Sequence, residues 1–186
     1  MLRTFLALPI PNTVADALLG VADILRPQLP PKSIRWVPRE NLHLTLWFLG
    51  ATRADQLPDI SAALNALGAN CSSFELRLHT VGCFPAERRP RVFWVGIQDD
   101  HALQQLHREL GDQLAPLGWE PEARAFHPHL TLGYARKNVR LPSWDGNVAV
   151  PATSWRANQV TLFESDLTSN GPTYKPVHTS KLAKKS

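Results

Sequence analysis

The tetrapeptide His-Leu-Thr-Leu occurs twice in this chain of 186 residues, beginning at His43 and again at His129. Both copies lie in apolar runs typical of β-strands, where successive side chains point to opposite faces of the sheet. Each copy therefore presents its histidine and its threonine (Thr45 or Thr131) on one face and two leucines on the other. A single strand histidine is usually structural, because short motifs often match by chance. Two identical copies favour a functional interpretation.

The two motifs belong to a longer internal repeat, which covers approximately residues 3–50 and 91–136. Arg3 opens the first unit and Arg91 opens the second, and each is followed by a strand pattern, a helix pattern and the motif. A repeat of this kind usually means one supersecondary unit used twice. Two such units packed about a pseudo-twofold axis would bring both His-x-Thr faces together across one cleft.

Hydrophobic periodicity predicts the elements between these landmarks. Strands are predicted at 2–9, 33–37, 42–49, 74–80, 92–97, 129–134, 154–163 and 173–179, and helices at about 12–26, 55–67 and 100–118. Asn12 and either Asp99 or Asp100 are expected to cap helices, and Gly68 is expected to end one. Because the strands do not alternate regularly with helices, an α+β fold with antiparallel sheets is predicted.

The composition fits one globular domain over residues 1–186, with 44% hydrophobic and 19% charged residues. The net charge of +4 is compatible with an anionic partner but does not require one. No stretch approaches the roughly 18 apolar residues of a membrane span, so no membrane association is expected. The basic residues 181–186 are expected to form a frayed, solvated tail.

The two cysteines, Cys71 and Cys83, form neither a CxxC pair nor a disulfide framework. A reducing, cytoplasmic compartment is the simplest expectation for such a chain.

Metal and cofactor chemistry has little support in the sequence. The segment His127-Pro128-His129 could suggest a metal site, but no carboxylate or cysteine cluster accompanies it. The chain also has no GxSxG, Walker A, HExxH or GxGxxG motif. We therefore expect neither a metal nor a cofactor.

A facing pair of histidines suits acid–base chemistry near neutral pH, because one imidazole can be neutral while the other is protonated. The hydroxyls of Thr45 and Thr131 can donate hydrogen bonds to the non-bridging oxygens of a phosphate held between them. One histidine would activate water, and the other would protonate the leaving alkoxide. A strained cyclic phosphodiester fits best, since its leaving oxygen stays tethered nearby.

These residues resemble those of a known family. The doubled HLTL is similar to the paired HxTx signature of the two-histidine (2H) phosphoesterases. The surrounding residues resemble the RNA 2′,3′-cyclic phosphodiesterases, also called the 2′-5′ RNA ligase family. These residues are Arg35-Trp36-Val37-Pro38, Glu40 to Leu46, Phe48-Leu49-Gly50, Phe126 to Gly133, Leu162-Phe163-Glu164-Ser165, Gly171 and Tyr174. The resemblance covers nearly the whole chain.

The resemblance implies a bilobal 2H phosphoesterase fold, with two pseudo-symmetric lobes of antiparallel sheet around a central cleft and helices outside. It implies metal-independent hydrolysis of a terminal RNA 2′,3′-cyclic phosphate to a 2′-phosphate, with 2′-5′ ligation as a related reaction. Carried over by position, His43 would protonate the leaving 3′ oxygen and His129 would activate water. Thr45 and Thr131 would hold the phosphate.

The sequence departs from the family pattern after the second motif. Family members often carry an arginine five residues past the second histidine, where this chain has Tyr134. Arg136 is the nearest arginine, and it would need a bulge or bend to reach the cleft; a phosphate contact and a solvated strand end both remain open. Phe48 and Tyr134 are candidates to stack on an unpaired base, although the sequence favours core packing for Phe48 and leaves Tyr134 open.

The expected partners are RNA ends or cyclic nucleotides, and a monomer is expected. Two alternatives remain open. One is a 2H enzyme that acts on a small cyclic nucleotide or on 2′-5′ linkages. The other is a non-catalytic RNA-binding module, which the intact histidine and threonine in both copies argue against.

Overall fold

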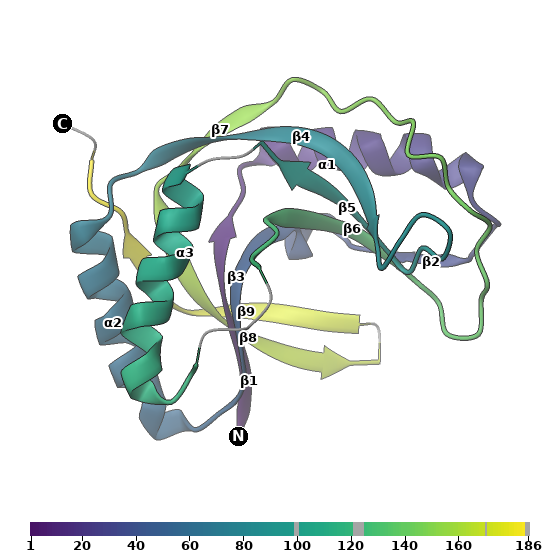
Figure 1. The fold of residues 1–186 in the computed structure, drawn as a ribbon. Helices are drawn as coiled ribbons and strands as arrows, with labels where there is room; N and C mark the ends of the chain where they lie inside the picture. Colours follow the sequence, from purple (N-terminus) through teal and green to yellow (C-terminus); the bar gives the residue numbers. More distant parts are fainter. Residues whose placement is uncertain (99–100, 121–124, 170, 185–186) are drawn as a thin grey trace.

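An antiparallel sheet curls through the computed structural model, which describes residues 1–98, 101–120, 125–169 and 171–184 (Figure 1). Its strands are β1 (Leu2–Pro9), β2 (Ile34–Trp36), β3 (His43–Thr52), β4 (Phe74–Phe84), β5 (Val92–Ile97), β6 (His129–Ala135), β7 (Ser154–Ala157), β8 (Gln159–Thr168) and β9 (Gly171–Lys181). They lie in the order β7-β4-β5-β6-β3-β1-β8-β9, and β2 pairs with β6 outside that path. All named strand pairs are antiparallel, so the predicted α+β fold with antiparallel sheets is confirmed.

The helices are α1 (Asn12–Leu25), α2 (Leu57–Asn70) and α3 (His101–Leu114), with 3₁₀ turns η1 (Arg26–Gln28), η2 (Arg39–Asn41), η3 (Ala54–Gln56) and η4 (Ala115–Leu117). Each α-helix buries one apolar stripe, which includes Leu18 in α1 and Leu103 in α3. Within the described residues, no helix has the length and apolar character needed to cross a membrane.

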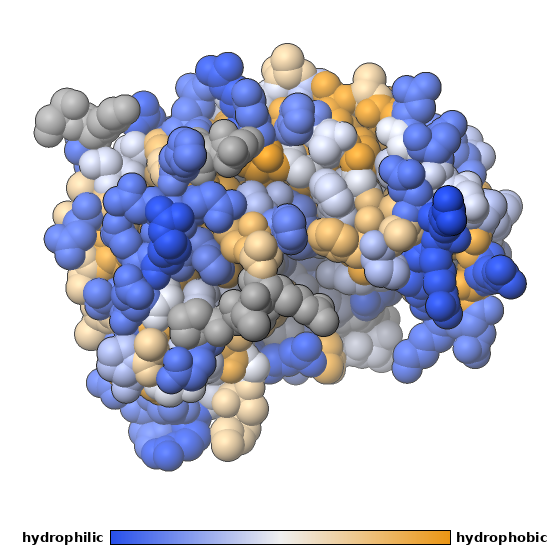
Figure 2. All heavy atoms as spheres, viewed as in Figure 1, coloured by the Kyte–Doolittle hydropathy of each residue, from blue (hydrophilic) through white to orange (hydrophobic). Residues whose placement is uncertain are grey.

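The sheet has two halves, which meet where β3 pairs with β6. β1, β8 and β9 continue the first half, and β5, β4 and β7 continue the second. Both halves use the same order of strand, helix and motif strand, as β1, α1, β3 and as β5, α3, β6. In Figure 1 the strands β4 to β6 arch above the β8–β9 hairpin. The space-filling view shows the surface hollowed between these two parts (Figure 2).

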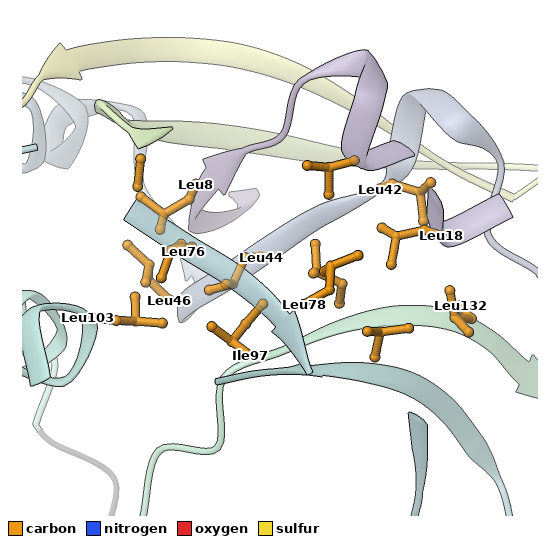
Figure 3. Close-up of a cluster of buried hydrophobic side chains, with 14 of the residues drawn as sticks. Leu8, Leu18, Leu42, Leu44, Leu46, Leu76, Leu78, Ile97, Leu103 and Leu132 are labelled. Carbon is orange, nitrogen blue, oxygen red and sulfur yellow. The ribbon is translucent and has the colours of Figure 1, made fainter. Parts of the chain in front are cut away.

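The leucines of both motifs anchor the motif strands in the hydrophobic core. Leu44 and Leu132 lie in one buried cluster with Leu18 of α1 and Leu103 of α3 (Figure 3). Burying a leucine side chain contributes about 1.5–3 kcal/mol, so these contacts fix both motif strands to the helices. The opposite face of the same strands, which we call the open face, is left to the histidines and threonines.

Two predicted boundaries are wrong because of contacts that are distant in sequence. Gly68 does not end α2 but lies inside it, where a Cβ would stand 2.4 Å from Ser180 Oγ on β9. The glycine is therefore needed for close packing of helix on strand. The predicted strand 154–163 is split at Asn158, whose carbonyl accepts a hydrogen bond from Leu182 N–H instead of continuing one strand.

The C-terminal residues and the first residue of α1 also differ from expectation. Lys181 ends β9, Leu182 is buried, and Ala183 N–H donates to the carbonyls of Gly68 and Cys71, so the expected frayed tail is wrong for these residues. Asn12 begins α1 as predicted, but its side chain makes no capping bond because Pro11 occupies the cap position. The caps expected at residues 99–100 lie outside the described residues.

Candidate active site

The two motifs meet at a single cross-strand pair, Leu44 opposite Leu130. Both leucines are fully buried, whereas the histidine and threonine of each motif are only partly buried. Strand alternation places these polar side chains on the open face. The pair Leu44–Leu130 therefore lies on the local pseudo-twofold axis that relates the two motifs.

This pairing brings four polar side chains together. In an antiparallel pair the two strands run in opposite directions, so one step from the leucine pair places His43 beside Thr131 and Thr45 beside His129. The charge of a protonated His129 lowers the pKa of His43, which reflects the same closeness. Each histidine thus has a threonine beside it on the neighbouring strand and another on its own strand.

Both imidazoles are oriented in the same way. His43 Nδ1–H donates to the carbonyl of Asn41 at 2.8 Å, and His129 Nδ1–H donates to the carbonyl of His127 at 2.7 Å. A carbonyl only accepts hydrogen bonds, so Nδ1 carries the proton in both neutral rings. The other nitrogen, Nε2, is left as the atom that can take up or release a proton.

The two Nε2 atoms have different partners. His43 Nε2 lies 3.0 Å from Thr45 Oγ1, which donates its hydroxyl hydrogen when the imidazole is neutral. For His129 Nε2 the structure shows no hydrogen bond from the residues that it describes. The lone pair of His129 Nε2 is therefore the more readily available base.

Burial makes both imidazoles hard to protonate. Desolvation, opposed by the Asn41 hydrogen bond, lowers the pKa of His43 from 6.5 to about 4. Desolvation also lowers the pKa of His129, with the charge of His127 acting in the same direction. Both rings are therefore mainly neutral at pH 7 in the free protein. An anion bound between them would raise both pKa values.

Aromatic side chains surround His43. The Phe5 ring lies 4.8 Å from the imidazole, Tyr174 packs edge-on at 5.2 Å, and Phe163 lies at 6.4 Å. Phe5 also stacks on Phe163 at 5.3 Å, so these rings form one wall from β1, β8 and β9. This wall removes water from His43, which explains the desolvation that lowers its pKa.

A pocket of about 380 Å³ opens beside His43, and its walls include Arg39, Glu40, Phe163 and Tyr174. Its volume falls in the range of small-molecule sites.

His129 has a smaller aromatic wall on the other half of the sheet. Phe84 packs edge-on to the imidazole at 5.1 Å, and Trp94 lies at 6.0 Å. The Trp94 ring lies so close to β4 that a Cβ at Gly82 would stand 2.2 Å from it. Glycine at 82 thus leaves room for the indole, whose ring plane is tilted 56° from that of His129.

A β-bulge lies at the last leucine of each motif. Leu46 is the extra residue of β3 against β1, and Leu132 is the extra residue of β6 against β5. Each bulge shifts the alternation by one residue, so Phe48 and Tyr134 turn to the open face. Phe48 is 67% exposed and Tyr134 is 39% exposed. Core packing, which the sequence favoured for Phe48, is therefore wrong.

The structure does not bring Arg136 to the motif residues. It follows the end of β6, and its backbone N–H donates to the carbonyl of Ser33. Its exposed side chain lines a separate pocket with Arg26, Lys32 and Trp36, which contains no motif residue. The bulge at Leu132 would turn Arg136 to the open face if the strand continued. However, β6 ends at Ala135, before it reaches Arg136.

Several residues of the site were missed by sequence reasoning. Phe5 and Phe84 carry no signal that distinguishes them from core residues, and Phe163 lies in a family-like segment that does not show its position beside His43. Tyr174 and Arg35 lie in family-like segments, but only the fold shows that they border the motifs. Within the described part of the chain, no group of three or more His, Cys, Asp or Glu residues could hold a metal ion.

The chain is similar to known proteins over most of its length. The family model of the 2′-5′ RNA ligase superfamily matches residues 15–168. The RNA 2′,3′-cyclic phosphodiesterase of Methanocaldococcus jannaschii is 30% identical over 95% of this chain and 98% of the relative. That of Bacillus subtilis is 27% identical over 96% of each chain.

Solved structures show the same fold. TT0787 of Thermus thermophilus superposes with a TM-score of 0.87 at 28% identity, covering 99% of this chain and 100% of that one. LigT of E. coli in its apo form has a TM-score of 0.76 at 27% identity and covers 98% of both chains. LigT has also been solved with 3′-AMP and with phosphate. This chain therefore belongs to the 2′-5′ RNA ligase superfamily.

Proposed function

We propose that this protein hydrolyses the 2′,3′-cyclic phosphate at an RNA end to a 2′-phosphate, without a metal ion. The observation that carries the proposal is the Leu44–Leu130 pair, which sets two oriented His-x-Thr faces side by side. The choice of substrate is supported by relatives named RNA 2′,3′-cyclic phosphodiesterase and by the LigT structure with 3′-AMP.

In the proposed reaction a water oxygen attacks phosphorus while His129 Nε2 takes the water proton. The bond from phosphorus to the 3′ oxygen breaks, and His43 Nε2–H gives its proton to that oxygen. The available lone pair of His129 Nε2 supports its role as base. Attack by a 5′-hydroxyl in place of water would form a 2′-5′ linkage with the same two proton transfers, so ligation needs no further group.

His43 takes up its proton from solvent when the substrate binds. The ring is neutral in the free protein, because its pKa is about 4. A phosphodiester anion beside it stabilises the imidazolium and raises the pKa. Once Nε2 is protonated it no longer accepts a hydrogen bond from Thr45, whose hydroxyl hydrogen can then turn to a phosphate oxygen. Thr131 offers a second hydroxyl from the other strand.

Phe48 provides a platform for the terminal base. It is a large aromatic side chain on the open face, five residues past His43, and its ring lies 6.3 Å from Phe5 in the His43 wall. Stacking of an unpaired base on an aromatic ring contributes about 1–3 kcal/mol and depends little on sequence.

We also propose that the protein acts as a monomer in the cytoplasm. The free thiols of Cys71 and Cys83 support a reducing compartment. Burial and hydrogen bonding to Glu109 raise the pKa of the Cys71 thiol to about 12, so this thiol stays protonated and unreactive.

The test is hydrolysis of an oligonucleotide that ends in a 2′,3′-cyclic phosphate, with EDTA present and the product isomer identified. A 2′-phosphate product is expected. A 3′-phosphate product would reverse the roles of the two oxygens. Salt-dependent RNA binding without turnover would support a binding module instead, and turnover of cyclic mononucleotides alone would support a small-molecule enzyme.

A further inference from the structure

Arg35 faces the same side of the sheet as the motif residues. β2 pairs with β6 so that Arg35 lies directly opposite Tyr134. Directly opposed residues project to the same face of an antiparallel pair. The bulge at Leu132 has already turned Tyr134 to the open face, and the Arg35 guanidinium lies 5.3 Å over the Tyr134 ring. The cation is therefore held on an aromatic platform beside the second motif.

The guanidinium of Arg35 also borders the other half of the site. Its Nη1 lies 3.9 Å from where a Cβ would stand at Gly171, the first residue of β9. Burial raises the pKa of Tyr174, and the charge of Arg35 acts in the opposite direction, which reflects its closeness to the phenol. Tyr174 in turn packs against His43, and Pro172 accepts a hydrogen bond from Asn41 Nδ2 at 2.7 Å. Arg35 therefore lies where the end of β6 faces the start of β9.

No acidic group in the described part of the chain forms an ion pair with this cation. Arg39, in the pocket beside His43, is by contrast paired with Asp16. An exposed cation with a fixed orientation and no counterion is suited to an anionic group of the ligand.

The position of Arg35 is offset from the reacting phosphate. Tyr134 lies three positions after Thr131, and one of the two residues between them is the extra residue of the bulge, so about 7–10 Å of strand separates them. The guanidinium lies over Tyr134 and not over Thr131. It is therefore placed for a phosphate next to the one held by the threonines.

We propose that Arg35, held by Tyr134, forms a subsite for the internal phosphate that precedes the terminal nucleotide of the RNA. This inference rests on the proposed function and names its substrate class as RNA chains in preference to cyclic mononucleotides. The planar guanidinium binds the two free oxygens of that phosphodiester.

The test compares a nucleoside 2′,3′-cyclic phosphate with a dinucleotide that ends in the same group. In the unmodified protein the dinucleotide has the higher kcat/KM. Arg35→Gln lowers the ratio of the two kcat/KM values at least tenfold, the scale of a lost hydrogen bond to a charged group. The salt dependence of the dinucleotide reaction becomes shallower by about 0.7 in log–log slope, the share of one phosphate contact on a single strand.

A chemical substitution in the substrate locates the contact. A methylphosphonate in place of the internal phosphate removes its charge. The unmodified protein then loses at least tenfold in kcat/KM, whereas Arg35→Gln shows the same kcat/KM with either linkage. A merely structural role of Arg35 would leave the effect of the methylphosphonate unchanged in the variant.

The chain offers a matched control. Arg26 also lies over an aromatic ring of β2, at 5.1 Å from Trp36, the residue after Arg35. However, it lines the separate pocket that contains no motif residue. Arg26→Gln therefore keeps the substrate ratio of the unmodified protein.

Three outcomes would overturn the subsite. The first is an equal loss on both substrates in Arg35→Gln, which would place Arg35 at the reacting phosphate. The second is an unchanged ratio with full activity in that variant. The third is a loss of the ratio in Arg26→Gln as well. If the unmodified protein turned over neither substrate, the proposed function itself would be rejected, and the subsite with it.

Discussion

The two copies of the motif have the same sequence but different surroundings. Both imidazoles are fixed through Nδ1 to a carbonyl two residues earlier. His43 then accepts a hydrogen bond from Thr45 and lies against the aromatic wall of β1, β8 and β9. His129 has an available Nε2 and a smaller wall from β4 and β5. Identical strands thus orient the rings alike, and the neighbouring strands make their protonation different.

A second difference follows each motif. Equivalent bulges turn Phe48 and Tyr134 to the open face, yet Phe48 offers its ring to solvent while Tyr134 carries Arg35. In the proposed function, the first half binds a base through Phe48 and the second half binds a phosphate through Arg35. A pseudo-symmetric site can in this way bind a substrate that has no symmetry, with acid and base on defined sides.

The largest expected effect separates acid from base. His43→Ala and His129→Ala each lower kcat by about 10²-fold or more, the usual contribution of a general acid or base. A substrate with sulfur in place of the 3′ bridging oxygen distinguishes them, because a thiolate leaves without a proton. With this substrate His43→Ala regains most of its activity, and His129→Ala does not.

The double variant serves as the control for this separation. If both residues act in one step, the double variant is little slower than the slower single variant. Sulfur rescue of His129→Ala instead of His43→Ala would exchange the two roles. Equal rescue of both variants would contradict a division of labour between the motifs.

The next effect concerns stability in acid. The folded state holds the pKa of His43 at about 4, below the 6.5 of the unfolded chain. Between these values the unfolded chain binds more protons, so stability is lost as the pH falls from about 6.5 toward 4. This difference corresponds to about 3 kcal/mol in the free energy of unfolding. His43→Gln therefore loses less stability than the unmodified protein between pH 7.5 and pH 4.5, measured by urea denaturation.

The comparison across pH within each variant removes any constant effect of the substitution. His129→Gln provides the matched case, since burial lowers the pKa of His129 too. It also reduces the acid sensitivity. A His43→Gln variant with the full acid sensitivity of the unmodified protein would show that the imidazole is not buried as described.

A smaller effect is expected at the threonines. Thr45→Val removes a phosphate contact and also the hydroxyl that donates to neutral His43, whereas Thr131→Val removes a phosphate contact alone. Both variants should lose about tenfold in kcat/KM, as for a hydrogen bond to a charged group. Only Thr45→Val should raise the pKa of the histidine in its own motif, because it removes the hydrogen bond that favours the neutral ring of His43. The pKa is measured by NMR of the imidazole protons.

The corresponding serine variants keep the hydroxyl and test whether its loss is responsible. Thr45→Ser should retain both the rate and the low pKa of His43. If Thr131→Val raised the pKa of His129 as much as Thr45→Val raises the pKa of His43, the proposed difference between the two motifs would be contradicted.

The sequence was sufficient for everything that depends on alternation within one strand. The leucines had to face the core and the histidines had to face away from it, because both sets lie at fixed positions of a strand. The duplicated pattern also predicted that the motifs would meet. The pair Leu44–Leu130 meets that expectation.

Contacts between strands distant in sequence could not be predicted in the same way. The bulges at Leu46 and Leu132 depend on how β3 and β6 register with β1 and β5, and regular alternation would leave Phe48 facing the core. Arg35 becomes part of the site only because β2 pairs with β6. Gly68 resembled a helix end, but it is the point where β9 packs on α2.

The smallest expected effect concerns Phe48, which lies beyond the first motif and is proposed to stack on the terminal base. Phe48→Ala should raise KM for an RNA end about fivefold, with little change in kcat, since stacking on the ring holds the base but takes no part in proton transfer. Ile24→Ala is a suitable control, because Ile24 is also an exposed large apolar residue but lies on α1. The rise in KM should be larger for RNA that ends in a purine than for RNA that ends in a pyrimidine, because a purine offers more surface to the ring. A loss in kcat alone would instead mean that Phe48 acts through the wall around His43, since its ring is 6.3 Å from Phe5. The two halves of the sheet would then differ in how their aromatic side chains affect the protonation of His43 and His129, and not in which part of the RNA each half binds.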